Sequence, residues 1–243
     1  MFSNLDINLS LNYIYDGSFE GLLTCIYEAY YRREKPERII KDGTMQEGLL
    51  YRNVYITSDS EKSGKVYNSI IAKISPEALQ NAYYVYLSND ENSGTFVYNY
   101  IKLGFRLGCD IDLYLADDRV HKIHEITRRV SYEIHLMLGL IRFRKIDGDI
   151  YYAPYSPDNN ITALLSPHFA DRMSDQNWVI HDIKRNVAAL YNKEKWIITD
   201  IQPGSFSLSG EEINYQDLWR DYFKNIAIQN RINPKLQSQH MPK

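Results

Sequence analysis

The feature that most constrains the fold is a change in the spacing of apolar residues near residue 139. From Asp117 to Leu138 apolar residues recur at the three- and four-residue spacing of an amphipathic helix, and Gly139 follows as a stop signal. From Leu140 to Ile146 and from Asp149 to Tyr155 they alternate, and the Asp147-Gly148 pair between these runs is a strong hairpin signal. The chain is therefore neither all-helical nor all-β.

The residues before the long helix predict a strand, a helix, a second strand and a series of helices. The strands are expected over Ile7–Tyr15 and Leu50–Thr57. The helices are expected from Phe19, from a Ser58-x-x-Glu61 capping box to about Ile74, from the Ser75-Pro76-Glu77 start, and over about 90–107.

After the hairpin the pattern predicts a short helix, three strands and a last helix. They are expected over Ile161–Ser174, Asn177–His181, Asn186–Tyr191, Lys195–Asp200 and Tyr215–Gln229. The fold class is α+β, with a mainly helical N-terminal half followed by an antiparallel β-meander of about five strands and a C-terminal helix. We expect an N-terminal α/β subdomain over 1–116 and a second subdomain over 117–243, sharing one core.

The net charge conceals a strong local asymmetry. The chain has 243 residues, with 28 Lys and Arg against 31 Asp and Glu, so its formal charge is −3, which argues against a protein that coats nucleic acid along its whole length. Arg119–Lys145 nevertheless holds seven Lys and Arg against two Glu, a net +5, and Arg220–Lys243 holds five against one Asp, a net +4. Such windows suit a phosphate-binding surface, although cations that solvate a helix face and pair with distant acids would give the same counts.

Cysteine content and apolar runs narrow the class of protein further. The chain has two cysteines, Cys25 and Cys109, too few for a disulfide framework or for a zinc or iron–sulfur site built from cysteine alone. The N-terminal residues lack the features of a signal peptide, and no apolar run approaches the roughly 18–20 residues of a spanning helix. We expect a cytoplasmic protein without a membrane segment, a metal site or a cofactor of its own.

The nearest approach to a catalytic constellation lies between residues 168 and 185. His168 and Arg172 are four residues apart in a predicted helix, while His181 and Asp182 end a strand that Arg185 follows. Two histidines beside Asp and Arg are suited to general acid–base chemistry on a phosphodiester or a base. No nucleophile, metal cage or glycine-rich phosphate loop accompanies them. Catalysis by His168, His181 and Asp182, ligand binding, and a self-satisfied hydrogen-bond network therefore all stay open.

Several cations are candidates for contacts with nucleic acid. Arg142 and Arg144 are expected on one face of a strand, where two guanidinium groups can hold a phosphate or pair with acids. The tail beyond Asn230 is aperiodic and polar, which suits contacts with phosphates and base edges. The full candidate set is Arg128, Arg129, Arg142, Arg144, Arg172, Arg185, Arg231, Lys235 and His240.

The strand-to-helix turn at Asp16-Gly17-Ser18 has two readings. Its residues are suited to a turn and a helix cap, which would set the entry into the first helix. The amide groups at the start of that helix would equally suit a phosphate or another anion.

Four ordered segments resemble a known family. They are Tyr15-Asp16-Gly17-Ser18-Phe19-Glu20-Gly21-Leu22-Leu23; Glu133-x-His135-x-x-x-Gly139-x-x-Arg142-Phe143 with Tyr152-Ala153-Pro154; Pro167-His168-Phe169-Ala170-Asp171-Arg172 with Ile180-His181-Asp182-x-x-Arg185; and Trp219-x-x-Tyr222 with Arg231-x-Asn233-Pro234-Lys235-x-Gln237-x-x-His240-Met241-Pro242. In this order they resemble a family of uncharacterised bacterial DNA metabolism or repair proteins. Such proteins are typically encoded beside a radical-SAM protein and sometimes fused to a uracil-DNA glycosylase-like domain.

The resemblance implies DNA as the target and a radical-SAM protein as the partner. The radical-SAM cluster would belong to that partner, because it needs three closely spaced cysteines and this chain has two distant ones. The main expectation is a DNA-binding protein that acts with a radical-SAM protein. The alternatives are an enzyme acting on a DNA lesion or nucleotide, and a protein–protein interaction module without DNA contact.

Overall fold

The computed structural model describes residues 10–43, 51–146 and 149–201. The chain divides into two compact units, Met1–Ser131 and Tyr132–Lys243, and the division falls inside the long helix α5 (Asp118–Leu140). The division expected between residues 116 and 117 lies just ahead of this helix. Helices dominate the first unit and strands the second, which confirms the α+β class.

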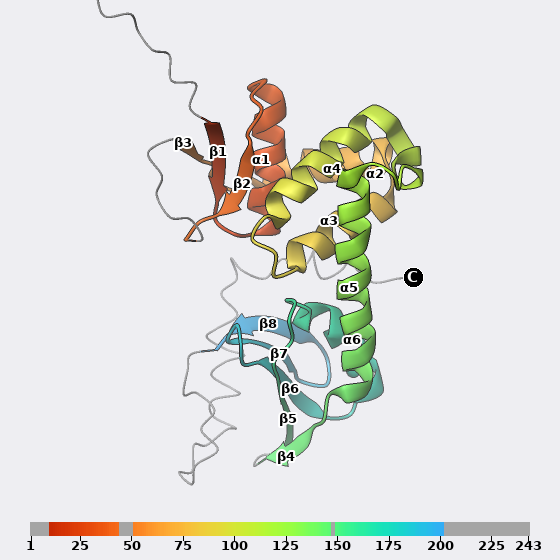
Figure 1. Ribbon diagram of the computed structural model, residues 1–243. Coiled ribbons are helices and arrows are strands. Elements are labelled where there is room, and N and C mark those ends of the chain that lie inside the picture. Colours follow the sequence, from red (N-terminus) through yellow and green to blue (C-terminus); the bar gives the residue numbers. More distant parts are fainter. Residues whose placement is uncertain (1–9, 44–50, 147–148, 202–243) are drawn as a thin grey trace, which may run out of the picture. The chain divides into compact units, whose positions relative to one another are not determined.

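The first unit is built on a small parallel sheet. Strands β1 (Ser10–Tyr15), β2 (Arg38–Lys41) and β3 (Tyr51–Tyr55) pair in the order β2-β1-β3 (Figure 1). The central strand β1 is buried on both faces from Asn12 to Tyr15, as is usual for a parallel sheet covered by helices. The sequence did not predict β2, because its two isoleucines lie between charged residues and give no periodic signal.

Five helical segments complete this unit before α5. They are α1 (Phe19–Tyr31), α2 (Ser60–Lys73), α3 (Pro76–Leu87), α4 (Ser93–Leu107) and the short 3₁₀ helix η1 (Gly108–Leu113). The N-terminus of α4 lies against the outer edge of β2. There the hydroxyl of Thr95 accepts a hydrogen bond from the Ile39 amide at 3.0 Å and donates to the Ile39 carbonyl at 3.4 Å.

Asp16 fastens the loop after β1 to the loop after β3. Its Oδ1 accepts hydrogen bonds from the amide and hydroxyl of Ser18 at 2.9 and 2.6 Å, and its Oδ2 accepts one from the hydroxyl of Ser58 at 2.7 Å. Burial opposes ionisation of Asp16, but the hydrogen bonds from Ser18 and Ser58 outweigh it and lower the pKa of this carboxyl. Ser18 in turn caps α1 by accepting from the Gly21 amide at 2.8 Å. These contacts favour the structural reading of the turn.

Two predicted helix starts have different outcomes. Ser75 caps α3 by accepting from the Ala78 amide at 2.9 Å, which confirms the predicted start. The Ser58 capping box is wrong, because Asp59 is the N-cap of α2 and accepts from the amides of Glu61 and Lys62, both at 3.0 Å. Ser58 instead donates to Asp16, a partner distant in sequence.

The long helix α5 runs through Gly139, which the sequence placed beyond its end. Arg142 donates hydrogen bonds to the carbonyls of Gly139 at 2.6 Å and Ile141 at 3.1 Å, so a side chain satisfies carbonyls at this helix end. The strand expected from Leu140 consequently begins only at Arg144.

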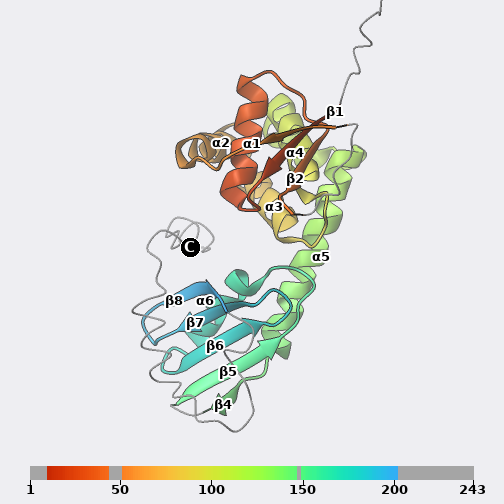
Figure 2. The same ribbon diagram turned by 90° about the vertical axis from the view of Figure 1, so that its left-hand side faces the viewer.

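The second unit is a five-stranded sheet with one parallel pair. Strands β4 (Arg144–Ile146), β5 (Ile150–Tyr155), β6 (Asn177–Asp182), β7 (Val187–Tyr191) and β8 (Trp196–Asp200) follow one another across the sheet (Figure 2). The β4–β5, β6–β7 and β7–β8 pairs are antiparallel, but β5 and β6 are parallel, so the expectation of a purely antiparallel meander is wrong. Helix α6 (Thr162–Arg172) lies between β5 and β6, and such a crossover returns the chain to the end from which β5 began.

Apolar side chains line both faces of this sheet. Tyr152, Val179 and Leu190 belong to a buried cluster on one face. On the other, the ring of Trp178 stacks on Tyr191 with 5.1 Å between centroids. Among the described helices none is long and apolar enough to cross a membrane. The predicted helix Tyr215–Gln229 and the basic tail lie outside the described residues.

The Asp16 network gives a first prediction. A Cβ on Gly21 would lie 2.4 Å from Asp16 Oδ1 and 2.8 Å from Ser58 Oγ, so Gly21→Ala must displace the hydrogen-bonded carboxylate. We expect it to lower the free energy of unfolding by about 1–3 kcal/mol, although Ala favours helix.

Gly64→Ala in α2 is the matched control, because nothing lies within 4 Å of the Cβ it would add. We expect it to raise the free energy of unfolding by about 0.5–1 kcal/mol. Urea denaturation of both variants measures the difference, and equal effects would contradict the role given to Asp16.

Candidate nucleic-acid interface

The predicted residues Asp182 and Arg185 form a buried structural pair at the end of β6. Asp182 is fully buried, and its Oδ1 accepts from the amides of Lys184 and Arg185 at 3.0 and 3.2 Å. Its Oδ2 lies 2.9 Å from Nη1 of Arg185. The same guanidinium donates to the carbonyls of Pro157, at 3.1 Å, and Asp158. The pair therefore anchors the loop that follows β5.

A carboxylate from α5 holds the same loop. Glu133 accepts hydrogen bonds from the Asp158 amide at 2.6 Å, the Asn159 amide at 3.0 Å and the Asn159 side chain at 2.6 Å. The loop therefore has ionic partners from α5 and from the turn after β6. This arrangement favours the hydrogen-bond network among the readings of Asp182 and Arg185.

The two histidines of the predicted constellation occupy different environments. His181 is buried, and its Nδ1 lies 2.8 Å from the Tyr152 hydroxyl. Burial lowers the pKa of His181, with the nearby Asp182 carboxylate acting in the opposite direction, so the ring is neutral at pH 7. His168 is exposed on α6, edge-on to the ring of Phe169, and Arg172 is exposed one turn later. Neither histidine lines either of the two pockets described below.

Arg142 and Arg144 line one small pocket, here called the arginine pocket. Its volume is about 220 Å³, and its other walls come from the end of α5 and from Pro154 and Tyr155 of β5. The structure thus brings the two predicted residues together, although only Arg144 belongs to a strand. Arg142 uses its guanidinium on the carbonyls at the end of α5, which leaves Arg144 as the more available cation.

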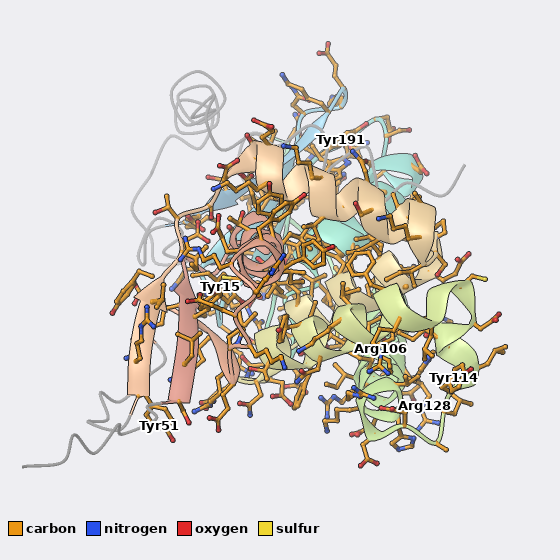
Figure 3. The ribbon with its side chains drawn as sticks, turned by 90° about the horizontal axis from the view of Figure 1, so that it is seen from above. Tyr15, Tyr51, Arg106, Tyr114, Arg128 and Tyr191 are labelled. Atoms are coloured by element: carbon orange, nitrogen blue, oxygen red, sulfur yellow. The ribbon has the colours of Figure 1, made fainter. Side chains whose placement is uncertain are left out.

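The remaining predicted cations lie on α5 or in the tail. Arg128, labelled in Figure 3, lies on α5. It and the neighbouring Arg129 are exposed and form no ion pair within the part of the chain that the structure describes. Glu125, on the same helix, lies 3.1 Å from Lys122. Arg231, Lys235 and His240 lie outside the described residues.

A second basic pocket, which the sequence did not predict, lies in the first unit between α1, α2, α4 and residues 33–35. We call it the tyrosine pocket; its volume is about 640 Å³. Five aromatic rings line it: Tyr27, Tyr30, Tyr31, Tyr98 and Phe105. Six cations also line it: Arg33, Lys35, Lys65, Lys73, Lys102 and Arg106. Arg106 lies on α4 in Figure 3.

Most of these cations keep their charge available. Lys65 pairs with Glu61 at 2.6 Å, and Lys102 lies over the ring of Tyr98 at 5.1 Å from its centroid. The other four, Arg33, Lys35, Lys73 and Arg106, form no ion pair with any residue in the described ranges.

The single carboxylate lining the tyrosine pocket is already bonded. Glu34 accepts a hydrogen bond from the hydroxyl of the buried Tyr13. Burial and this bond raise the pKa of Tyr13 well above its ordinary value, so the phenol stays protonated and remains a donor. The pocket lining therefore has one negative charge, Glu34, against six cations, and Tyr13 of β1 holds that carboxylate in place.

The rings of α1 form an ordered cluster at the rim. Tyr27 and Tyr31 are one turn apart and stack with 4.2 Å between centroids, and Tyr30 meets Tyr31 at 79° with centroids 5.3 Å apart. Tyr30 is 76% exposed and Tyr31 64% exposed. What distinguishes Tyr30 and Tyr31 from other exposed apolar residues is that they adjoin each other and Tyr27 at the rim of a pocket.

A buried ion pair fixes the wall that carries these rings. Glu28 of α1 is mostly buried and lies 2.8 Å from Nζ of Lys62 on α2 and 2.5 Å from Nε of Arg32. The hydrogen bond from Lys62, together with that from Arg32, outweighs burial and lowers the pKa of Glu28. The carboxylate therefore stays ionised and holds α1 against α2.

Arg33 has a backbone conformation that favours glycine. Its φ is +55°, and the Glu34 amide donates to the Ala29 carbonyl at 3.1 Å while the Arg33 amide donates to the Tyr30 carbonyl at 3.2 Å. These two bonds define a Schellman motif, whose left-handed position is most often Gly. An arginine there accepts about 1 kcal/mol of strain. Arg33 lines the tyrosine pocket despite this strain.

Charge counting along the chain missed the tyrosine pocket, because its cations come from three separate segments. Lys65 and Lys73 are eight residues apart on α2, and Lys102 and Arg106 are four apart on α4. The pocket could have been found by looking for cations at helical spacing, but not by counting charges in windows of consecutive residues. Among the described residues, no group of three or more His, Cys, Asp and Glu is placed to hold a metal ion.

The fold and its pockets define an α+β protein of two units whose first unit carries a basic pocket lined with aromatic rings. The chain belongs to the family described as a domain of unknown function, DUF4130, whose sequence profile matches residues 91–243. That match includes α4 and α5 and begins after α1 and α2. No curated protein matches the chain.

His181 generates a prediction on pH. Because its pKa is lower in the folded protein than the ordinary value of about 6.5, the unfolded chain binds the proton more readily as the pH falls. The contribution of His181 to stability is fully present above about pH 6.5 and is lost below it. We expect the free energy of unfolding to fall between pH 7 and pH 5, as measured by chemical denaturation.

In His181→Asn this part of the pH dependence should disappear, because Asn keeps an acceptor near the Tyr152 hydroxyl and does not titrate. His168→Asn, at an exposed position, is the control and should keep it. An unchanged profile for His181→Asn would contradict the assignment.

Proposed function

We propose that this protein binds DNA and that the tyrosine pocket of its first unit is the principal contact. The observation that carries the proposal is the convergence of four cations, Arg33, Lys35, Lys73 and Arg106, around exposed tyrosine rings, none of the four having an ion pair within the described residues. Cations supply the contacts to phosphates that dominate affinity for nucleic acid, and rings supply contacts to bases. A ligand with both phosphates and aromatic bases uses every group in the pocket.

The whole-chain charge of −3 is compatible with this proposal. Binding depends on the local field, and the tyrosine pocket has six cations against one carboxylate that already accepts a hydrogen bond. Arg142 and Arg144 of the arginine pocket and the exposed Arg128 and Arg129, the contacts expected from the sequence, are proposed as further contacts. The described residues offer less support for the enzymatic alternative, because Asp182 is tied into a structural network and His181 is buried.

We further propose that the protein acts in DNA metabolism or repair, in the bacterial cytoplasm, together with a radical-SAM protein. Support comes from the four motif segments described above. Cys25 is buried and Cys109 exposed, and the two lie far apart in sequence, so a radical-SAM cluster would reside in the partner. Co-expression with the radical-SAM protein that the resemblance implies as its neighbour should give a complex stable to gel filtration. Separate elution of the two proteins, both folded, would contradict the partnership.

The test of DNA binding is the salt dependence of the affinity. Lys73→Gln combined with Arg106→Gln should remove two phosphate contacts, which makes the slope of log K against log salt less negative by about 1.4 on a single strand. If the variant and the wild-type protein bind equally at about 1 M salt, this difference in slope makes the variant bind about 25-fold more weakly at about 0.1 M salt. Fluorescence anisotropy with labelled oligonucleotides measures both quantities.

Lys193→Gln combined with Lys195→Gln is the matched control, since both lysines are exposed in the second unit. An unchanged slope for the pocket variant, or an equal loss in the control, would contradict the pocket. If DNA affinity fell only in the double variant Arg142→Ala with Arg144→Ala, the binding site would be assigned to the arginine pocket instead.

Arg33→Gly separates binding from folding in the same assay. Glycine relieves the left-handed strain at this position, so the free energy of unfolding should rise by about 0.5–1 kcal/mol. Removal of the cation should nevertheless weaken DNA binding and make the slope of log K against log salt less negative by about 0.7. A more stable protein with unchanged affinity would exclude Arg33 from the site.

A further inference from the structure

We infer that the tyrosine pocket takes an unpaired strand and stacks one of its bases on Tyr31. This inference rests on the proposed function and adds the form of nucleic acid that is recognised. It follows from the arrangement of the rings at the rim, from the position of the cations around them, and from the size of the pocket.

The ring of Tyr31 is held in place while much of its surface stays exposed. Tyr27 stacks on it at 25° with 4.2 Å between centroids, and Tyr27 and Tyr31 both project from α1 one turn apart. The Glu28–Lys62 pair holds that helix against α2. A ring supported in this way loses little conformational freedom when a base stacks on it, which favours binding.

The base faces of a duplex cannot reach such a ring. In double-stranded DNA each base is stacked between its neighbours, so a ring outside the helix meets only groove edges and phosphates. An unpaired base offers its whole face, and stacking on an aromatic side chain tolerates any base. Exposed tyrosines beside several cations are therefore better suited to a single strand than to a duplex.

The dimensions and charges of the pocket lead to the same conclusion. A volume of about 640 Å³ is typical of a site for a small molecule rather than for the width of a double helix. Arg33 and Lys35 follow the end of α1, while Lys73 and Arg106 come from α2 and α4, so cations lie on more than one side of the rings. A strand that places a base on Tyr31 would have flanking phosphates within the field of these cations.

The experiment compares four ligands by competition and fluorescence anisotropy. They are a thymidine strand of about 12 nucleotides, an abasic strand with the same number of phosphates, a duplex of the same length, and thymidine monophosphate. We expect the thymidine strand to bind about tenfold or more tightly than the abasic strand, which is what stacking of a single base provides. It should also bind more tightly than the duplex and far more tightly than the mononucleotide.

Tyr31→Leu should weaken binding of the thymidine strand about tenfold and leave binding of the abasic strand and its salt slope unchanged. Tyr31→Phe should keep the wild-type affinity, because it keeps the ring. Tyr55→Leu is the matched control, since Tyr55 is 68% exposed on β3 and does not line the pocket. Because Tyr31 is largely exposed, these variants are expected to fold.

Equal affinity for thymidine and abasic strands, or tighter binding of the duplex, would overturn this inference while leaving salt-dependent DNA binding intact. Equal affinity for the mononucleotide would overturn it in favour of a nucleotide site. Failure of every oligonucleotide to bind at low salt would instead reject the proposed function itself.

Discussion

The tyrosine pocket depends on one buried carboxylate, Glu28. A carboxylate held mostly out of water is stable only with cations beside it, and Lys62 and Arg32 supply them from α2 and from the end of α1. This pairing fixes the spacing of α1 and α2, and with it the side on which Tyr27 and Tyr31 project. Loss of either partner would leave an uncompensated charge in the wall, so the ion pair maintains both the packing of α1 against α2 and the shape of the pocket.

Two kinds of arginine emerge from the described contacts. Arg185 and Arg142 donate to backbone carbonyls, and the first also pairs with Asp182; their charge is used within the protein. Arg33 and Arg106 have no such partners among the described residues and line a pocket. The sequence treats these four residues alike, because nothing in a count of positive charge distinguishes a guanidinium that closes a loop from one that faces solvent. The distinction arises only when distant segments come together.

The sequence was most informative where structure is local. The Ser75 cap, the three strands after residue 176 and the strands on either side of Asp147-Gly148 were predicted because each is determined by neighbouring residues. Prediction from the sequence failed where the local structure depends on a residue or element distant in sequence. Ser58 bonds Asp16 and leaves the cap to Asp59, and α6 makes β5 and β6 parallel. The tyrosine pocket belongs to this second group, since its walls meet only after three helices pack.

The contact between α4 and β2 has a consequence for how the first unit behaves in a crowded solution. Thr95 occupies both hydrogen-bonding groups of Ile39 on the outer edge of β2, and the approach is close enough that a Cβ on Gly94 would lie 2.6 Å from the Ile39 carbonyl oxygen. An exposed strand edge is a template on which another chain can add and aggregate. Here a helix start closes that template at the centre of β2 through Gly94 and Thr95, while the charged Arg38 and Lys41 flank the two isoleucines.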